Sequence, residues 1–165
     1  MTTKEVFEQI VRDHQAMIHR IARSYEARTT AVEDLVQDIY MAIWQALPDF
    51  RGESSIRTFV ARIANNRAIT HVARASRMPL AVELNEHLPA PGTDPEHRAI
   101  AQNRSARLSS AVRIMPLTYR QVAMLALEGL TAREIADVLG ITSNAVAIRL
   151  SRAKNWLRAH MGDMR

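Results

Sequence analysis

The sequence predicts an all-α protein made of two small helical domains joined by a flexible linker, with a helix-turn-helix in the C-terminal domain. The chain of 165 residues contains only 5 glycines and 6 prolines, too few turn residues for a many-stranded sandwich or barrel. It contains 25 alanines, and alanine is the strongest helix former. No apolar run approaches the roughly 18 residues of a membrane span, and the N-terminal segment lacks the apolar core of a signal peptide. We therefore expect a cytoplasmic protein.

Cysteine is absent, which excludes disulfides, zinc–thiolate sites and a cysteine nucleophile. The acidic residues Glu33, Asp34 and Asp38 have no histidine or further carboxylate at ligand spacing. No nucleophile–base pair, phosphate-binding loop or metal-ligand spacing occurs elsewhere. We therefore expect no catalytic residue, no metal site and no cofactor, and the protein is predicted not to be an enzyme.

The formal charge of +5 is unevenly distributed along the chain. Residues 1–78 carry a net charge of +2 and residues 95–165 carry +6, while the stretch 79–94 between them carries −3. Because residues 79–94 hold three prolines and no Lys or Arg, they are predicted to be the linker. Residues 51–77 contain six arginines against one glutamate, whereas residues 26–49 contain five acids and one arginine. Two basic surfaces and an acidic one favour nucleic-acid and protein partners, although scattered arginines can also cover solvated helix faces.

Three helices are predicted in residues 1–78. Apolar residues recur at spacings of three and four from Val6 to Tyr25, the period of an amphipathic helix. A second helix begins near Thr30 and ends at Pro48, and a face distinct from its apolar stripe carries Asp34, Gln37, Asp38, Met41 and Gln45. After a polar segment, a third helix presents arginines for phosphates and polar groups for bases at Arg57, Arg62, Asn66, Arg67, Thr70, His71 and Arg74.

The C-terminal half shows the pattern of a helix-turn-helix. A helix from Pro95 to Met115 stops at Pro116, and a short helix follows from Tyr119 to Leu127. Thr131 and Glu134 fit a capping box, Gly140 suits the left-handed position after a helix, and Thr142 or Ser143 caps the next helix. That helix has an inward stripe at Val146, Leu150, Ala153 and Leu157.

The second helix of this motif has the composition of a DNA-reading helix. Its outward positions are Ser143, Asn144, Ala147, Ile148, Ser151, Arg152 and Asn155, flanked by Arg149, Lys154 and Arg158. Small residues let the backbone approach the major groove, and the basic residues contact phosphates. A glycine after a helix and alanines within one are also common in helical bundles without DNA-binding activity, but the combination favours DNA binding.

Two ordered stretches resemble bacterial RNA polymerase sigma factors. Val32-Glu-Asp-Leu-Val-Gln-Asp-Ile-Tyr-Met-Ala-Ile-Trp44, followed by Phe50-Arg-Gly-Glu-Ser-Ser-Ile-Arg-Thr-Phe-Val-Ala-Arg-Ile-Ala-Asn-Asn66, resembles conserved region 2. Met115-Pro-Leu-Thr-Tyr-Arg120, Glu134-Ile-Ala-Asp-Val-Leu-Gly-Ile141 and Val146-Ala-Ile-Arg-Leu-Ser-Arg-Ala153 resemble region 4. Two regions joined by a linker are the arrangement of the extracytoplasmic-function (ECF) subfamily. The resemblance assigns region 2 to residues 1–78 and region 4 to residues 95–165.

The resemblance implies an alternative sigma factor that binds core RNA polymerase, recognises the −10 and −35 promoter elements and promotes promoter opening. It implies that Asp34, Gln37, Asp38 and Met41 bind the β′ clamp helices, while the C-terminal domain packs on the β flap. It implies that the loop 49–55 captures a base of the −10 element. The residues implied to contact this element are Arg51, Arg62, Asn66, Arg67, Thr70, His71 and Arg74. The residues implied to contact the −35 element are Ser143, Asn144, Ala147, Ile148, Arg149, Ser151 and Arg152. An anti-sigma factor is a further expected partner.

Two departures from the family pattern stand out. Phe59 and Val60 replace the usual Trp-Leu pair, and Ala147 stands where region 4 commonly has a lysine. Ala147 and Ile148 can instead contact thymine methyl groups. The alternative function is a free-standing helix-turn-helix regulator, which needs neither an acidic docking helix nor a base-capture loop.

Overall fold

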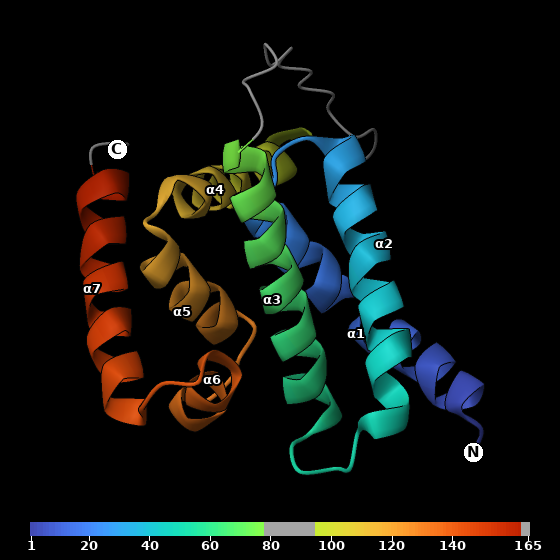
Figure 1. The fold of residues 1–165 in the computed structure, drawn as a ribbon. Helices are drawn as coiled ribbons and strands as arrows, with labels where there is room; N and C mark the ends of the chain where they lie inside the picture. Colours follow the sequence, from blue (N-terminus) through green and yellow to red (C-terminus); the bar gives the residue numbers. More distant parts are fainter. Residues whose placement is uncertain (78–94, 163–165) are drawn as a thin grey trace.

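The computed structural model describes residues 1–77 and 95–162, and these residues form seven α-helices, a short 3-10 helix and no β-strand (Figure 1). The elements are α1 (Thr3–Tyr25), α2 (Thr29–Ala46), η1 (Leu47–Asp49), α3 (Ile56–Arg77), α4 (Pro95–Ile114), α5 (Leu117–Leu127), α6 (Ala132–Leu139) and α7 (Ser143–Gly162). The predicted all-α fold class is confirmed. The predicted linker 79–94 lies outside the described residues. None of the described helices is long and apolar enough to cross a membrane.

Helices α1, α2 and α3 pack together as the N-terminal bundle. A capping box starts α1, because the Glu5 backbone N–H donates to the Thr2 hydroxyl and the Glu5 carboxylate accepts from the Thr2 backbone N–H. Alanines on α3 allow close helix packing, since Ala61, Ala64 and Ala68 are fully buried. The predicted inner stripes of α1 and α2 form the core, which includes the fully buried side chains Ile18, Ile21, Ile39 and Ile43.

The loop that precedes α3 is fixed at both of its ends. Gly52 has a φ of +74°, a left-handed conformation that glycine adopts without strain. Ser55 caps α3, because its hydroxyl accepts the Thr58 backbone N–H at 3.1 Å. The Phe50 ring packs on Phe59 with 4.6 Å between ring centroids. The loop is therefore held at a defined place beside the first turn of α3.

Helices α4 to α7 form the C-terminal bundle, whose α6–turn–α7 unit is the predicted helix-turn-helix. The capping box of Thr131 and Glu134 is present at the start of α6. Gly140 ends this helix with φ +65°, the predicted left-handed conformation. Of the two candidate caps for α7, Thr142 is the one that accepts a backbone N–H, from Ala145 at 3.1 Å. Local sequence signals thus set the geometry of the turn.

Helix α5 begins at Leu117, two residues before the predicted start at Tyr119. The backbone N–H groups of Tyr119 and Arg120 both donate to the carbonyl of Pro116, at 3.0 and 2.9 Å. The proline that ends α4 therefore also begins the next helical turn.

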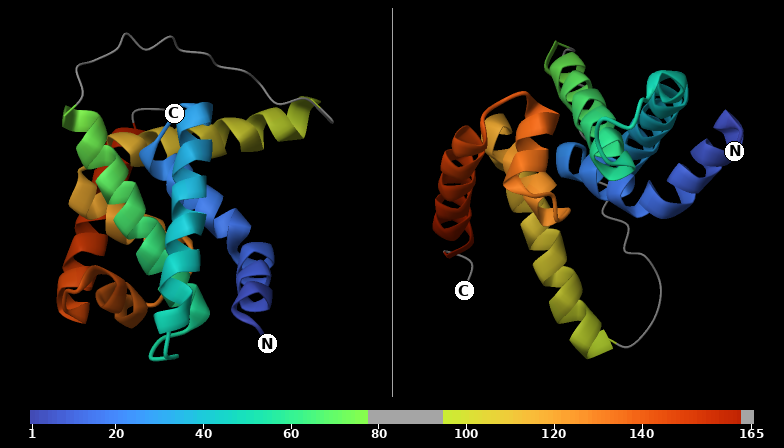
Figure 2. Two further views of the ribbon diagram at one scale, coloured as in Figure 1. Left: turned by 45° about the vertical axis from the view of Figure 1, so that its right-hand side comes forward. Right: turned by 90° about the horizontal axis from the view of Figure 1, so that it is seen from below.

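The two bundles pack against each other. Helix α6 contacts α3, while α4 and α5 contact α1. In Figure 1 the green helix α3 stands between α2 and the helix-turn-helix, and Figure 2 shows the same packing from two further sides. Surfaces on α2 and α7 consequently lie on opposite sides of the molecule.

Candidate DNA-binding and protein-docking surfaces

The four predicted docking residues of α2 share one face of the helix. Asp34, Gln37 and Met41 are exposed, and the Asp38 side chain is 46% exposed. Their spacing of three and four residues places them in a single stripe. The opposite side of α2 is buried in the core. The structure therefore brings these residues together on an acidic face that also exposes a large apolar side chain.

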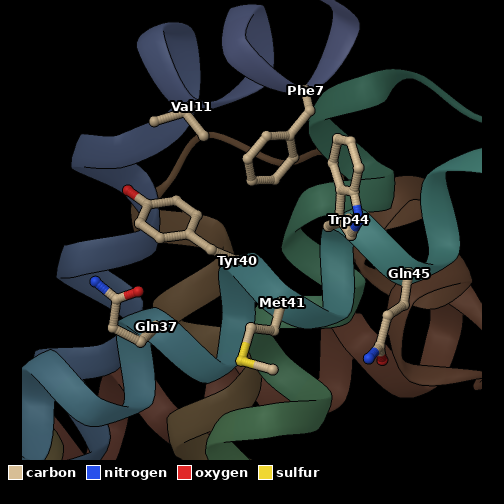
Figure 3. Close-up of a pocket in the computed structure, with 7 residues that line it drawn as sticks. All are labelled: Phe7, Val11, Gln37, Tyr40, Met41, Trp44 and Gln45. Atoms are coloured by element: carbon tan, nitrogen blue, oxygen red, sulfur yellow. The ribbon is translucent and has the colours of Figure 1, made fainter. Parts of the chain in front are cut away.

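A pocket of about 420 Å³ adjoins this stripe, between α1 and α2 (Figure 3). Gln37 and Met41 belong to both the stripe and the pocket. Trp44 is 44% exposed and meets the Phe7 ring edge-on, with 5.2 Å between ring centroids. The complete lining is Phe7, Val11, Gln37, Tyr40, Met41, Trp44 and Gln45. An exposed apolar patch rimmed by polar groups is typical of a protein-binding surface.

Sequence patterns did not predict that α1 contributes to this surface. Phe7 and Val11 fit the inner stripe of an amphipathic helix, and they are only partly buried because the pocket lies above them. The one available signal was Trp44, an aromatic residue three positions after Met41 on the same face of α2.

Four of the seven predicted −10 residues are exposed and lie along α3 or the preceding loop. Arg51 lies in the loop, and Asn66, Thr70 and Arg74 lie on α3. The Thr70 hydroxyl donates to the Asn66 carbonyl at 3.0 Å, within the helix. The structure thus leaves these four side chains open to solvent, three of them on α3.

The other three predicted −10 residues contact protein groups. Arg62 donates to the backbone carbonyl of Asp137 on α6 at 3.4 Å. Arg67 lies 3.9 Å from the carboxylate of Asp38. The His71 ring nitrogen Nε2 lies 2.8 Å from the carboxylate of Glu26, which is described next. The arginine-bearing face of α3 is thus partly occupied by the rest of the protein.

Glu26 has a strongly perturbed acidity. Its side chain is 10% exposed, and this burial acts to raise its pKa. Hydrogen bonds from the side chain and backbone N–H of Arg28 and from His71 outweigh burial, so that the pKa falls to about 2. Glu26 is therefore an anion at any physiological pH and holds His71 against the end of α1.

The predicted recognition face of α7 is solvent-exposed. The exposed positions are Ser143, Asn144, Ala147, Ile148, Ser151 and Arg152, while Arg149 is half-buried. Ile148 is 45% exposed and is the large apolar side chain among these exposed positions. Val146 and Ala153 of the inward stripe are buried, and Leu150 and Leu157 pack against the core. The helix therefore presents a mixed polar, apolar and basic face suited to a DNA groove.

Two family profiles match the chain in the predicted order. Residues 10–78 match sigma-70 region 2, and residues 105–157 match sigma-70 region 4. The first match covers most of α1 and all of α2 and α3, and the second covers α6 and most of α7.

Curated relatives match over most of the chain. The RNA polymerase sigma factor CnrH of Cupriavidus metallidurans is 31% identical over 94% of this chain and 86% of its own length. The ECF RNA polymerase sigma factor SigG of Mycobacterium tuberculosis is 33% identical over a stretch that covers 76% of this chain and 40% of the longer SigG.

Two solved structures share the fold. CnrH in complex with the cytosolic domain of CnrY superposes with a TM-score of 0.72, at 28% identity over 97% of this chain and 90% of that one. The sigma factor RpoE of Bartonella quintana, in complex with the anti-sigma factor NepR, superposes with a TM-score of 0.74 over 98% and 99% of the two chains. At 19% identity, the second match concerns the fold alone.

Proposed function

The chain belongs to the ECF sigma factors of bacterial RNA polymerase, and from that membership we propose which of its surfaces bind polymerase and which bind the promoter. As an alternative sigma factor it acts in transcription initiation. The observation that carries the assignment is the N-terminal bundle, which has an acidic, partly apolar face on α2 beside the arginine-bearing helix α3. A regulator that binds duplex DNA alone has no use for such a pair of surfaces.

The α2 face is proposed to dock on the β′ clamp helices of core polymerase through Asp34, Gln37, Asp38 and Met41. The exposed carboxylates would attract a basic surface and set the register of the complex. Met41 would supply apolar contact area, because its flexible thioether adapts to an irregular partner. The C-terminal bundle is proposed to pack on the β flap.

Helix α3 and the loop before it are proposed to bind the −10 element while it is opened. Extruding a base from the stack costs a few kcal/mol, which a fitted pocket and backbone contacts repay. The anchored loop 49–55 is the proposed capture site. Arg51, Arg62, Arg67 and Arg74 would bind phosphates, and Asn66, Thr70 and His71 would hydrogen-bond to bases.

Helix α7 is proposed to read the −35 element as duplex DNA in the major groove. Its short polar start at Ser143 and Asn144 and its small Ala147 allow close approach, and Ile148 can meet a thymine methyl group. Arg149, Ser151 and Arg152 complete the proposed contact face. Arg152 is the exposed arginine best suited to a bidentate contact with guanine.

The chain is proposed to have no catalytic activity and no cofactor of its own, and to work in the cytoplasm where its polymerase and promoter partners are found. Its relatives are sigma factors, which contribute specificity to the polymerase. An anti-sigma factor is proposed as a further partner. The CnrH structure, at 28% identity, holds the cytosolic domain of a second protein, CnrY, which supports that proposal.

The decisive experiment is run-off transcription on a promoter library with core polymerase, in the presence and absence of the full chain. The proposal expects new start sites preceded by common −10 and −35 elements only when the chain is present. Duplex binding by the chain alone, without any selected start sites, would contradict it and favour the free-standing regulator.

A further inference from the structure

Three aromatic rings from two helices form one wall of the pocket between α1 and α2. The Phe7 ring of α1 lies between Tyr40 and Trp44 of α2 (Figure 3), and its centroid is 6.5 Å from that of Tyr40 and 5.2 Å from that of Trp44. Both contacts are edge-to-face, at interplanar angles of 84° and 81°, an arrangement that aromatic pairs prefer. The first half of α1 is therefore fixed against α2, and the pocket is formed before any partner binds.

The lining of this pocket leaves apolar surface uncovered. Met41 is 61% exposed and Trp44 is 44% exposed, and no charged residue belongs to the lining. Burial raises the pKa of the Tyr40 hydroxyl, so the phenol stays neutral. The volume of about 420 Å³ falls within the range of roughly 300–1,000 Å³ that is usual for ligand pockets. Covering this surface with an apolar group gains free energy, whereas a charged group would lose its hydration there without meeting an opposite charge.

Acidic side chains lie beside the pocket rather than in it. Asp34 and Asp38 belong to the α2 stripe, which shares Gln37 and Met41 with the pocket. Glu33 is exposed and lies one helical turn before Gln37, on the same side of α2. These carboxylates would repel an acidic partner and attract a basic one. The group that suits the pocket is therefore an uncharged apolar side chain whose own neighbours are basic.

We propose that the pocket is the anchor site for one uncharged apolar side chain, branched aliphatic or aromatic, which the β′ clamp helices of core polymerase present between basic residues. This inference rests on the proposed docking of α2 and adds α1 to that interface. The mode of binding is a helix laid along a groove with an apolar side chain as its anchor. Aromatic contacts shielded from water carry much of the binding free energy of an interface, which makes Trp44 and Phe7 the residues that select the partner side chain.

The pocket and the stripe then have different roles in one interface. Exposed carboxylates such as Asp34 attract the basic partner over a distance and raise the association rate, an effect that salt screens. The apolar contact in the pocket is not screened by salt, and it slows dissociation. The two contributions can therefore be separated by measuring the affinity for core polymerase at low and at high sodium chloride concentration.

Variants of the full chain test the anchor site by truncation and by filling. Trp44→Ala removes part of the aromatic wall, while Trp44→Phe keeps a ring there. Val11→Trp leaves every α2 residue in place and fills the pocket from α1. The matched control is Ala16→Trp, which adds the same side chain at an exposed position of α1 outside the lining. Far-UV circular dichroism and thermal unfolding check that each variant is folded.

The proposal expects Trp44→Ala and Val11→Trp each to bind core polymerase about tenfold more weakly than the parent, by the same factor at low and high salt. Trp44→Phe should stay within about threefold of the parent, and Ala16→Trp should match it. If Trp44→Ala fails to fold, Val11→Trp decides alone. Parent-like affinity of Val11→Trp would overturn the anchor site. Equal weakening by Ala16→Trp, or an effect of Trp44→Ala that disappears at high salt, would also overturn it.

Photocrosslinking identifies the partner side chain directly. With p-benzoylphenylalanine in place of Val11, the full chain bound to core polymerase should crosslink to an uncharged apolar residue of the β′ clamp helices, located by mass spectrometry. The same group in place of Ala16 is the control and should give no such product. Crosslinks from position 11 to another polymerase subunit, or to a second copy of this chain, would overturn the proposal.

Failure of this inference is distinguishable from failure of the proposed function. A chain that loses affinity for core polymerase on Asp34→Arg but not on Val11→Trp docks through the stripe alone, which overturns only the anchor site. A parent chain that neither binds core polymerase nor supports a run-off product contradicts the proposed function itself.

Discussion

The carboxylate of Asp38 on α2 lies 3.9 Å from the guanidinium of Arg67 on α3. This ion pair joins the proposed polymerase-docking face to the proposed −10 face. The two side chains are 46% and 37% exposed, so the pair contributes at most about 1 kcal/mol to stability. Its significance lies in its position, because a charge change at Asp38 alters both surfaces, whereas a change at Asp34 alters only the docking face.

Asp34→Arg is therefore the sharper test of docking. We expect this variant to bind core polymerase about tenfold more weakly at low ionic strength, because it places a cation opposite the basic surface to which the α2 face is proposed to dock. Its thermal unfolding should match that of the parent, since the side chain is exposed. Fluorescence anisotropy with labelled chain and core polymerase measures the affinity.

The control for this variant is Asp13→Arg, the same charge change at an exposed position of α1. Equal affinities of the two variants would remove the special role of Asp34. Undiminished binding by a double variant that combines Asp34→Arg with Asp38→Arg would show that the docking face lies elsewhere.

Gly140 controls the geometry of the helix-turn-helix through its backbone. Its φ of +65° is strained for any residue with a Cβ, although no atom lies within 4 Å of that position. Gly140→Ala should therefore lower the free energy of unfolding by about 1 kcal/mol, measured by urea denaturation. Gly162→Ala is the control, because its Cβ would also meet open space but its φ is ordinary. Equal effects of the two changes would mean that backbone strain at Gly140 is negligible.

The helices and caps could be predicted because their signals are local. The capping box of Thr131 and Glu134 spans only four residues. Pro116 ends one helix and starts the next within a few residues of itself, and the helix end at Gly140 depends on the positive φ of that one residue. The fold class and the exposed face of α7 follow from such signals together with the helical period. The shared face of Asp34, Gln37, Asp38 and Met41 on α2 follows from the helical period in the same way, whereas its docking role was predicted from the resemblance and stays a prediction.

The contacts between the bundles could not be predicted from the sequence. Arg20 and Glu128 are 108 residues apart, and no periodic pattern links them. Arg62 reads as an outward DNA contact because its neighbours define an inner stripe, yet the C-terminal bundle lies against it. Burial by a second bundle depends on how whole surfaces fit, which a helical period does not encode.

The acidity of Glu26 predicts a pH-dependent stability. Burial acts to raise its pKa, but hydrogen bonds from Arg28 and His71 lower it to about 2, below the value of roughly 4.3 in an unfolded chain. The stabilisation is therefore fully present above about pH 4.5 and is lost as the pH falls towards 2. Glu26→Gln should lower the free energy of unfolding by roughly 1–2 kcal/mol at pH 7, and this difference should shrink as the pH falls and vanish below about pH 2.

Urea denaturation across this pH range measures that effect. The control is Glu8→Gln. The Glu8 side chain is 49% exposed, and its ion pair with Lys4 is long, at 3.8 Å, and therefore weak. Its substitution should change stability by a few tenths of a kcal/mol. A Glu26→Gln difference that is constant from pH 7 to pH 2 would contradict the assigned pKa.

Arg152 and Lys154 separate base reading from phosphate binding on α7. Both are exposed, but Arg152 lies on the predicted recognition face and Lys154 flanks it. Arg152→Ala should weaken binding to −35 duplex by about 1–3 kcal/mol and relax the preference at one base pair, as expected for loss of a bidentate contact. Lys154→Ala should weaken binding to all duplexes alike and reduce the slope of log affinity against log salt by about 1.

Electrophoretic mobility shifts of the full chain on duplexes with single base-pair changes, at several salt concentrations, distinguish the two variants. If Arg152→Ala also weakened every duplex equally, Arg152 would be a phosphate contact and the base specificity would have to come from other exposed residues of α7, such as Asn144 and Ile148.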